Sequence, residues 1–168
     1  MPFRILLTIC VSVFVLNAKD TPNVVYILAD DLGYGDLSHA GGKAATPHCD
    51  QLAREGMRFI DSHTTSSVCT PTRYGILTGR YNWRSTLKKS VLWGLSEPLI
   101  EKDRLTVPGF LRQQGYHTAV VGKWHLGLGE KGSRVNWNAD VKPGPLEVGF
   151  DYSFLLPSTN DRVPCVFL

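Results

Sequence analysis

The feature that most constrains the fold is a continuous apolar run, residues 23–29, with the sequence NVVYILA. Its length suits a single strand, and it lacks the alternation of a strand that has one face in water. Uninterrupted apolar strands are typical of parallel sheets, in which both faces are covered. A turn-rich segment, residues 30–42, follows directly. The run therefore predicts a buried strand of a parallel sheet.

Short helical segments alternate with further apolar runs along the chain. The pair Thr46-Pro47 predicts the cap and first turn of a helix that ends at Gly56. Further helices are predicted at residues 74–77 and 106–114, and further strands at residues 59–65 and 117–121. From Lys123 onward Gly, Pro and Asn dominate, which predicts loop. Alternating strands and helices favour an α/β fold, a mostly parallel sheet with helices on both faces.

The composition is that of an ordinary globular chain of about one domain. Of its 168 residues 43% are hydrophobic and 20% are charged, which is enough apolar content for a core. The net charge is +3, but Lys and Arg are interspersed with Asp and Glu and never form a block. This pattern argues against nucleic-acid binding.

The first eighteen residues differ from the rest of the chain. Arg4 is followed by an apolar run, residues 5–16, and then by the small residue Ala18. This order predicts a secretory signal peptide at residues 1–18. The run is shorter than the ~20 residues that a membrane-spanning helix needs. We therefore expect an exported protein, secreted or periplasmic, with no stable membrane span.

Three of the four cysteines follow the predicted signal peptide: Cys49, Cys69 and Cys165. Three thiols in a chain of this length do not resemble the dense framework of a small disulfide-stapled domain. An odd number suggests a separate role for one of them. If that one is Cys69, the other two either pair or stay free, and their spacing does not decide.

Polar residues follow two of the predicted strands. Asp30 and Asp31 come after the first, and Lys123 and His125 come after the strand at residues 117–121. Ligands of open parallel sheets gather at the carboxyl ends of the strands. Two carboxylates that meet there repel each other unless a cation lies between them, and hard oxygen ligands suit calcium or magnesium. A solvated turn with an acidic helix cap is an equally weighted alternative for the aspartate pair.

The segment Cys69-Thr70-Pro71-Thr72-Arg73 places a cysteine before a proline that can open a helix. The positive amino end of a helix favours a reactive group or a bound anion. A buried structural cysteine is the alternative. A cysteine-phosphatase loop is excluded because Gly75 stands where it needs an arginine.

Three segments together resemble the successive amino-terminal signatures of the sulfatase family: YILADDLGYGDLSHAGG, SSVCTPTRYGILTGRY and GYHTAVVGKWHLG. The most specific part is C-x-P-x-R followed by T-G-R, here Cys69 to Arg80. The resemblance implies a fold similar to alkaline phosphatase, incomplete in this chain. Residues 19–168 are then expected to be the truncated amino-terminal part of the catalytic domain.

The resemblance also implies the nucleophile and the metal site. Cys69 matches the residue that a formylglycine-generating maturation enzyme oxidises to formylglycine. Asp30 and Asp31 match ligands of a calcium ion, to which the modified residue 69 adds an oxygen. Arg73 matches the residue that orients and neutralises the hydrated aldehyde.

Further roles follow from the same resemblance. Lys123 and His125 match active-site residues of the G-K-W-H signature, the lysine at the sulfate oxygens and the histidine as a proton acceptor. By a weaker alignment, Thr159 or Ser158 lies where the family has a hydroxyl near the substrate.

The expected function is therefore hydrolysis of sulfate monoesters by an arylsulfatase-like enzyme. A phosphatase or phosphonate hydrolase of the same superfamily is one alternative, because a metal ion and an oxygen nucleophile also serve phosphoryl transfer. An inactive truncated remnant is the other. Even with formylglycine at residue 69, we expect the 168-residue chain alone to be inactive.

Overall fold

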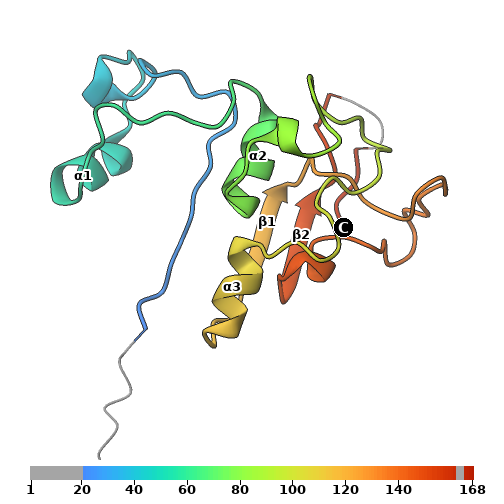
Figure 1. Cartoon of the computed structure of the whole chain (residues 1–168). Coiled ribbons are helices and arrows are strands. Elements are labelled where there is room, and N and C mark those ends of the chain that lie inside the picture. Colours follow the sequence, from blue (N-terminus) through green and yellow to red (C-terminus); the bar gives the residue numbers. More distant parts are fainter. Residues whose placement is uncertain (1–20, 162–164) are drawn as a thin grey trace, which may run out of the picture.

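The computed structural model describes residues 21–161 and 165–168, so the predicted signal peptide lies outside the described residues. It contains a two-stranded parallel sheet and three α-helices (Figure 1). The strands are β1 (Ala119–Lys123) and β2 (Tyr152–Leu156). Their register pairs Ala119 with Tyr152 and Lys123 with Leu156. The α/β class and the parallel pairing are confirmed.

Two of the three α-helices, α1 (Pro47–Glu55) and α3 (Val107–Gln113), begin and end close to the residues that local signals predict. The third helix is α2 (Cys69–Thr78), and the 3-10 turns are η1 (Ser38–Ala40), η2 (Asn82–Arg84) and η3 (Leu146–Val148). Gly56 ends α1, as predicted. At α3 the side chain of Thr106 accepts a hydrogen bond from the backbone N–H of Gly109 at 3.1 Å, a standard N-cap. Helix α2 begins five residues before the predicted segment, at Cys69 itself, and ends at Gly79, whose φ is 65°.

Two predicted strands are wrong. Residues 23–29 and 59–65 form no strand in the described structure, and their apolar side chains are exposed; Ile27 is 82% and Ile60 80% exposed. The first run passes along the β1 side of the sheet (Figure 1). No backbone hydrogen bond joins it to another described segment. An apolar run becomes a strand only where a neighbouring strand accepts its backbone hydrogen bonds.

Strand β2 is the opposite case, because residues after Lys123 were predicted to be loop. Its sequence YSFLL is short and follows a segment rich in Gly and Pro. Pairing with β1 makes it a strand. On its other side, Leu155 exchanges two backbone hydrogen bonds with Leu168, at 2.9 and 3.0 Å.

The core lies between α2, β2 and the segment that follows β1. Its buried apolar side chains are Tyr74, Leu99, Ile100, Trp124, Leu126, Leu128, Phe150 and Leu155. The ring of Trp124 meets that of Phe150 edge-on, with centroids 6.3 Å apart. The segment after β1 is therefore anchored by packing, and it carries His125. Within the described residues no helix is long and apolar enough to cross a membrane.

Candidate active site at the carboxyl end of β1

Three of the predicted site residues converge beside the last residue of β1. Lys123 ends β1, and its ammonium group lies 2.5 Å from a carboxylate oxygen of Asp30. Arg73, one turn into α2, contacts the other oxygen of Asp30 at 3.5 Å. Its guanidinium also donates to the backbone carbonyl of Lys123. Residues 30, 73 and 123 thus meet at one edge of the sheet, as the position of ligand sites in parallel sheets predicts.

The surroundings of Asp30 keep its carboxylate ionised. Partial burial, the largest single influence, acts to raise the pKa of Asp30. The hydrogen bond from Lys123 and the charges of Lys123 and Arg73 act in the other direction and together outweigh it. The pKa of Asp30 is therefore below its ordinary value of 3.8.

Asp31 lies at the turn that follows the extended run. Its φ of 57° is left-handed, a conformation uncommon outside glycine but tolerated by aspartate and asparagine. Its side chain is exposed. The chain therefore turns at the aspartate pair, as expected for two adjacent carboxylates that serve one site.

The oxygen ligands at this turn are of the type that calcium binds, but there are too few of them to complete its coordination shell. Asp30 and Asp31 offer the hard oxygen ligands that calcium prefers, whereas calcium takes six to eight. Both oxygens of Asp30 already face cationic side chains. Among the described residues, no group of three or more His, Cys, Asp or Glu side chains is arranged to hold a metal ion.

Cys69 is the first residue of α2, preceded by the extended Val68. Its thiol is free and half-buried, whereas Cys49 and Cys165 are free and exposed. The backbone N–H of Thr72 donates to the carbonyl of Val68 at 3.2 Å, which closes the first helical turn around the cysteine. The cysteine therefore occupies the predicted position at the positive end of a helix.

His125 is buried in the segment after β1, with 1% of its surface exposed. Its backbone is left-handed, with φ at 56°, and its N–H donates to the carbonyl of Pro157 at 3.0 Å. Its ring Nε2 lies 2.8 Å from the carbonyl oxygen of Leu92. His125 follows Lys123 onto the same edge, and its ring is oriented by a backbone group on another segment.

Ser158 and Thr159 follow the carboxyl end of β2, which lies beside the carboxyl end of β1. Their hydroxyl oxygens are buried, and neither has a hydrogen-bond partner among the described residues. The Nε of Arg73 is buried and lacks an acceptor in the same part of the chain. Buried polar atoms of this kind are costly unless a ligand or water satisfies them.

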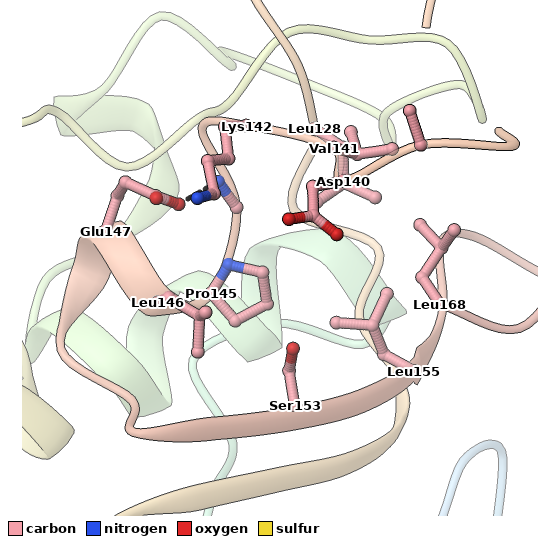
Figure 2. A pocket seen from close by; sticks show the side chains of 12 residues that line it. Leu128, Asp140, Val141, Lys142, Pro145, Leu146, Glu147, Ser153, Leu155 and Leu168 are labelled. Atoms are coloured by element: carbon pink, nitrogen blue, oxygen red, sulfur yellow. Dashed lines mark hydrogen bonds between the residues drawn. The ribbon is translucent and has the colours of Figure 1, made fainter. Parts of the chain in front are cut away.

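A hollow of the described structure lies away from these residues. Its volume is about 290 Å³, and it is lined by residues 139–142 and 144–147, by Ser153 and Leu155 of β2, and by Leu128 and Leu168 (Figure 2). None of the predicted site residues lines it. Aliphatic side chains of Leu128, Val141, Leu155 and Leu168 surround much of it (Figure 2). The candidate active site therefore lies at the carboxyl edge of the sheet and not in this cavity.

Two contributors at the site were not singled out from the sequence. Thr70 is completely buried, and its hydroxyl donates to the carbonyl of His125 at 3.0 Å. Leu92 binds both Thr70 and His125 through its backbone. Thr70 lies inside the cysteine motif, a signal that marks it for attention, but nothing in the local sequence points to Leu92.

Comparison with known proteins identifies the family of the chain. The Sulfatase family model matches residues 22–163. The chain belongs to the sulfatase family. Its fold is consistent with an incomplete alkaline-phosphatase-like domain.

Individual relatives of the chain are also named as sulfatases. Over 148 residues the chain is 49% identical to the N-acetylgalactosamine-6-O-sulfatase of Bacteroides thetaiotaomicron, covering 88% of this chain and 29% of that protein. It is 40% identical over 151 residues to arylsulfatase A of Bos taurus, covering 89% of this chain and 28% of that one. The chain thus spans less than a third of the length of these curated relatives.

Solved structures show the same likeness. A structure from work on the metabolism of multiple glycosaminoglycans by Bacteroides thetaiotaomicron superposes with a TM-score of 0.84 at 48% identity, covering 89% of this chain and 31% of that chain. The PsFucS1 sulfatase from Pseudoalteromonas sp. gives a TM-score of 0.62 at 36% identity, covering 80% and 25%.

Proposed function

We propose that this chain carries the nucleophile-bearing side of the active site of a sulfuric ester hydrolase that cleaves sulfate monoesters. One observation carries the proposal: Cys69 begins α2 at the edge of the sheet where Arg73 and Lys123 converge on Asp30. Membership of the sulfatase family supports it.

Cys69 is proposed to be the precursor of formylglycine, made by a formylglycine-generating maturation enzyme. The half-buried free thiol at the first position of α2, within the C-x-P-x-R motif, supports this assignment. The hydrated aldehyde supplies one hydroxyl to attack sulfur and a second through which sulfate is later released. An unmodified thiol or a serine hydroxyl has no second hydroxyl and would remain esterified.

Arg73 and Lys123 are proposed to bind the peripheral oxygens of the sulfate group. Arg73 still has a buried Nε without an acceptor among the described residues, and a sulfate oxygen is a suitable acceptor. Lys123 brings a second cation to the same edge. Cationic groups already held in place stabilise the charge that develops on the sulfate oxygens in the transition state.

His125 is proposed to accept the proton from the second hydroxyl of residue 69. Support comes from its place two residues after Lys123 and from its ring, oriented by the carbonyl of Leu92. Thr159, with Ser158 as the alternative, is proposed to lie near the substrate, because both buried hydroxyls follow the adjacent strand end without a partner among the described residues.

Asp30 and Asp31 are proposed to hold calcium together with an oxygen of residue 69. A bound calcium ion would polarise sulfate oxygens and favour the ionised nucleophile. Calcium takes six to eight oxygen ligands, and among the described residues no further His, Cys, Asp or Glu side chain joins the aspartate pair in a group that could hold a metal ion. For this reason the 168-residue chain alone is expected to be inactive.

The substrate is proposed to be a sulfate ester and not a phosphate ester, because the cysteine motif belongs to sulfatases. Phosphatase or phosphonate hydrolase activity remains the alternative to assay. A relative that is 49% identical is named for N-acetylgalactosamine-6-O-sulfate, so a sulfated amino sugar is the first natural substrate to test beside an aryl sulfate.

Export is part of the proposal, on the strength of Arg4, the apolar run at residues 5–16 and Ala18. Amino-terminal sequencing of secreted protein is expected to begin near Lys19. A cytosolic protein that keeps its intact terminus would contradict export.

The nucleophile is tested by producing the chain together with a formylglycine-generating enzyme and analysing its tryptic peptides by mass spectrometry. Cys69 lies in the peptide of residues 59–73 and Cys49 in that of residues 44–54, so the chain contains its own control. We expect the aldehyde at residue 69 and an unchanged thiol at residue 49. A peptide that retains only the Cys69 thiol, under conditions that convert another sulfatase, would refute the proposal.

A further inference from the structure

We propose that Thr70 is a positioning residue which, together with the backbone of Leu92, fixes the ring of His125 in the tautomer that carries hydrogen on Nε2. The role of this tautomer in catalysis rests on the proposed function, but the tautomer itself does not. The residues belong to three segments: the first turn of α2, the loop at residue 92, and the segment after β1.

The hydroxyl of Thr70 joins the other two segments. It donates to the carbonyl of His125 at 3.0 Å and accepts from the backbone N–H of Leu92 at 3.2 Å. The directions are unambiguous, because a carbonyl only accepts and an amide N–H only donates. The hydroxyl uses its single hydrogen and one of its lone pairs in a fully buried position.

The backbone of Leu92 also contacts the ring of His125. Its carbonyl oxygen lies 2.8 Å from Nε2 of His125. Since the carbonyl has no hydrogen to give, Nε2 must carry the hydrogen in this bond. In the neutral ring the basic lone pair is therefore on Nδ1, so the nitrogen that accepts a proton is determined by a backbone group.

The same hydrogen bonds support an uncommon backbone conformation of His125. His125 has φ at 56°, and a non-glycine residue persists there only where its surroundings hold it. Its carbonyl is held by Thr70, its N–H by Pro157 and its ring by Leu92. Because Thr70 directly follows Cys69, one hydroxyl couples the helix of the nucleophile to the orientation of the histidine.

If the hydroxyl of Thr70 were purely structural, its removal would change only the stability of the chain. We propose that it also determines the tautomer of the His125 ring. Three variants separate the two roles. Thr70→Val keeps the shape and removes the hydroxyl, and Thr70→Ser restores the hydroxyl. Thr118→Val is the control, because Thr118 is also buried and its hydroxyl also lies at hydrogen-bond distance from a backbone carbonyl, that of Gly149 at 2.9 Å, beside a carboxylate oxygen of Asp151 at 3.1 Å.

The experiment is nitrogen NMR of the chain with labelled histidines, without substrate and at a pH at which the ring of His125 is neutral. We expect His125 in the wild type, Thr70→Ser and Thr118→Val to show a protonated Nε2 and an unprotonated Nδ1. In Thr70→Val we expect a mixture of tautomers, even at a denaturation midpoint equal to that of Thr118→Val. A wild-type ring with hydrogen on Nδ1, or averaged like an exposed histidine, would overturn the proposal, as would an unchanged ring in Thr70→Val. If residue 69 failed to become formylglycine, the proposed function would be refuted, but the result on the tautomer of His125 would be unaffected.

Discussion

The two sides of the candidate site are built differently. On the side of the proposed nucleophile, Tyr74 of α2 and Leu126 after β1 are almost completely buried, and they anchor the segments that carry Cys69 and His125. On the carboxylate side, the run that leads to Asp30 and Asp31 exposes its apolar side chains on both faces. Among the described residues, side-chain contacts are made beside the two ends of that run: Tyr116 donates to the carbonyl of Pro22 at 3.1 Å, and Lys123 and Arg73 contact Asp30.

This difference shows that the nucleophile side is preorganised by its own packing, whereas the carboxylate side depends on charge. Asp30 is held by Lys123 and Arg73, through contacts that water and salt can weaken because the aspartate is 38% exposed. A catalytic constellation needs both sides to be rigid. The following predictions test the contrast, beginning with the largest effect.

The sharpest comparison is between two truncations of apolar side chains. Leu126→Ala removes a side chain that is 1% exposed, and a buried leucine truncated to alanine typically costs about 2–5 kcal/mol of unfolding free energy. Ile27→Ala removes one that is 82% exposed, and we expect a change within about 0.5 kcal/mol. Urea denaturation of both variants measures the difference. Equal losses would show that the run at residues 23–29 is packed in solution.

A substitution at Gly75 tests how tightly α2, the helix that begins at Cys69, is packed. A Cβ at this position would lie 2.2 Å from the hydroxyl oxygen and 2.7 Å from the methyl group of Thr65. We expect Gly75→Ala to destabilise the chain by about 1–3 kcal/mol despite the higher helix propensity of alanine. Thermal denaturation is the measurement, and Gly35→Ala is the control because nothing lies within 4 Å of its Cβ position. A stabilised Gly75→Ala variant would contradict the close packing.

Calcium binding tests the carboxylate side directly. We expect Asp31→Ala to weaken calcium binding at least about tenfold, since even groups that only support metal ligands contribute this much. Isothermal calorimetry measures the affinity, and Asp36→Ala, a change to a nearby acidic residue outside the aspartate pair, serves as the control. Equal affinity of the wild type and Asp31→Ala would remove Asp31 from the proposed site.

The smallest effect is the contribution of Asp30 to stability at low pH. Because its pKa is lowered in the folded chain, its stabilisation is complete above 3.8 and is lost as the pH falls through the folded-state value. Solvent screening of a carboxylate this exposed limits the effect to less than about 1 kcal/mol. We expect Asp30→Asn to flatten the acid side of the stability profile below pH 4 and leave its shape at higher pH unchanged. An identical acid limb in both proteins would show that the ion pairs contribute nothing.

Local signals were enough to predict several helices from the sequence. The Thr46-Pro47 start and the Gly56 stop act within a few residues of α1, and Thr106 caps α3 in the same way. The candidate site residues were predicted from short motifs. The structure brings Asp30, Arg73 and Lys123 into contact, although these residues are separated by 43 and 50 positions.

Strands and hydrogen-bond partners depended on the tertiary structure. Residues 23–29 have every local property of a strand but no backbone partner, whereas β2 becomes a strand through its pairing with β1. In the same way, Leu92 orients the ring of His125 from 33 positions away. The ends of α1 and α3 are decided by interactions between near neighbours, so the sequence predicts them closely by itself. Strand pairing and the tautomer of a buried histidine are decided by backbone groups that only folding brings within reach.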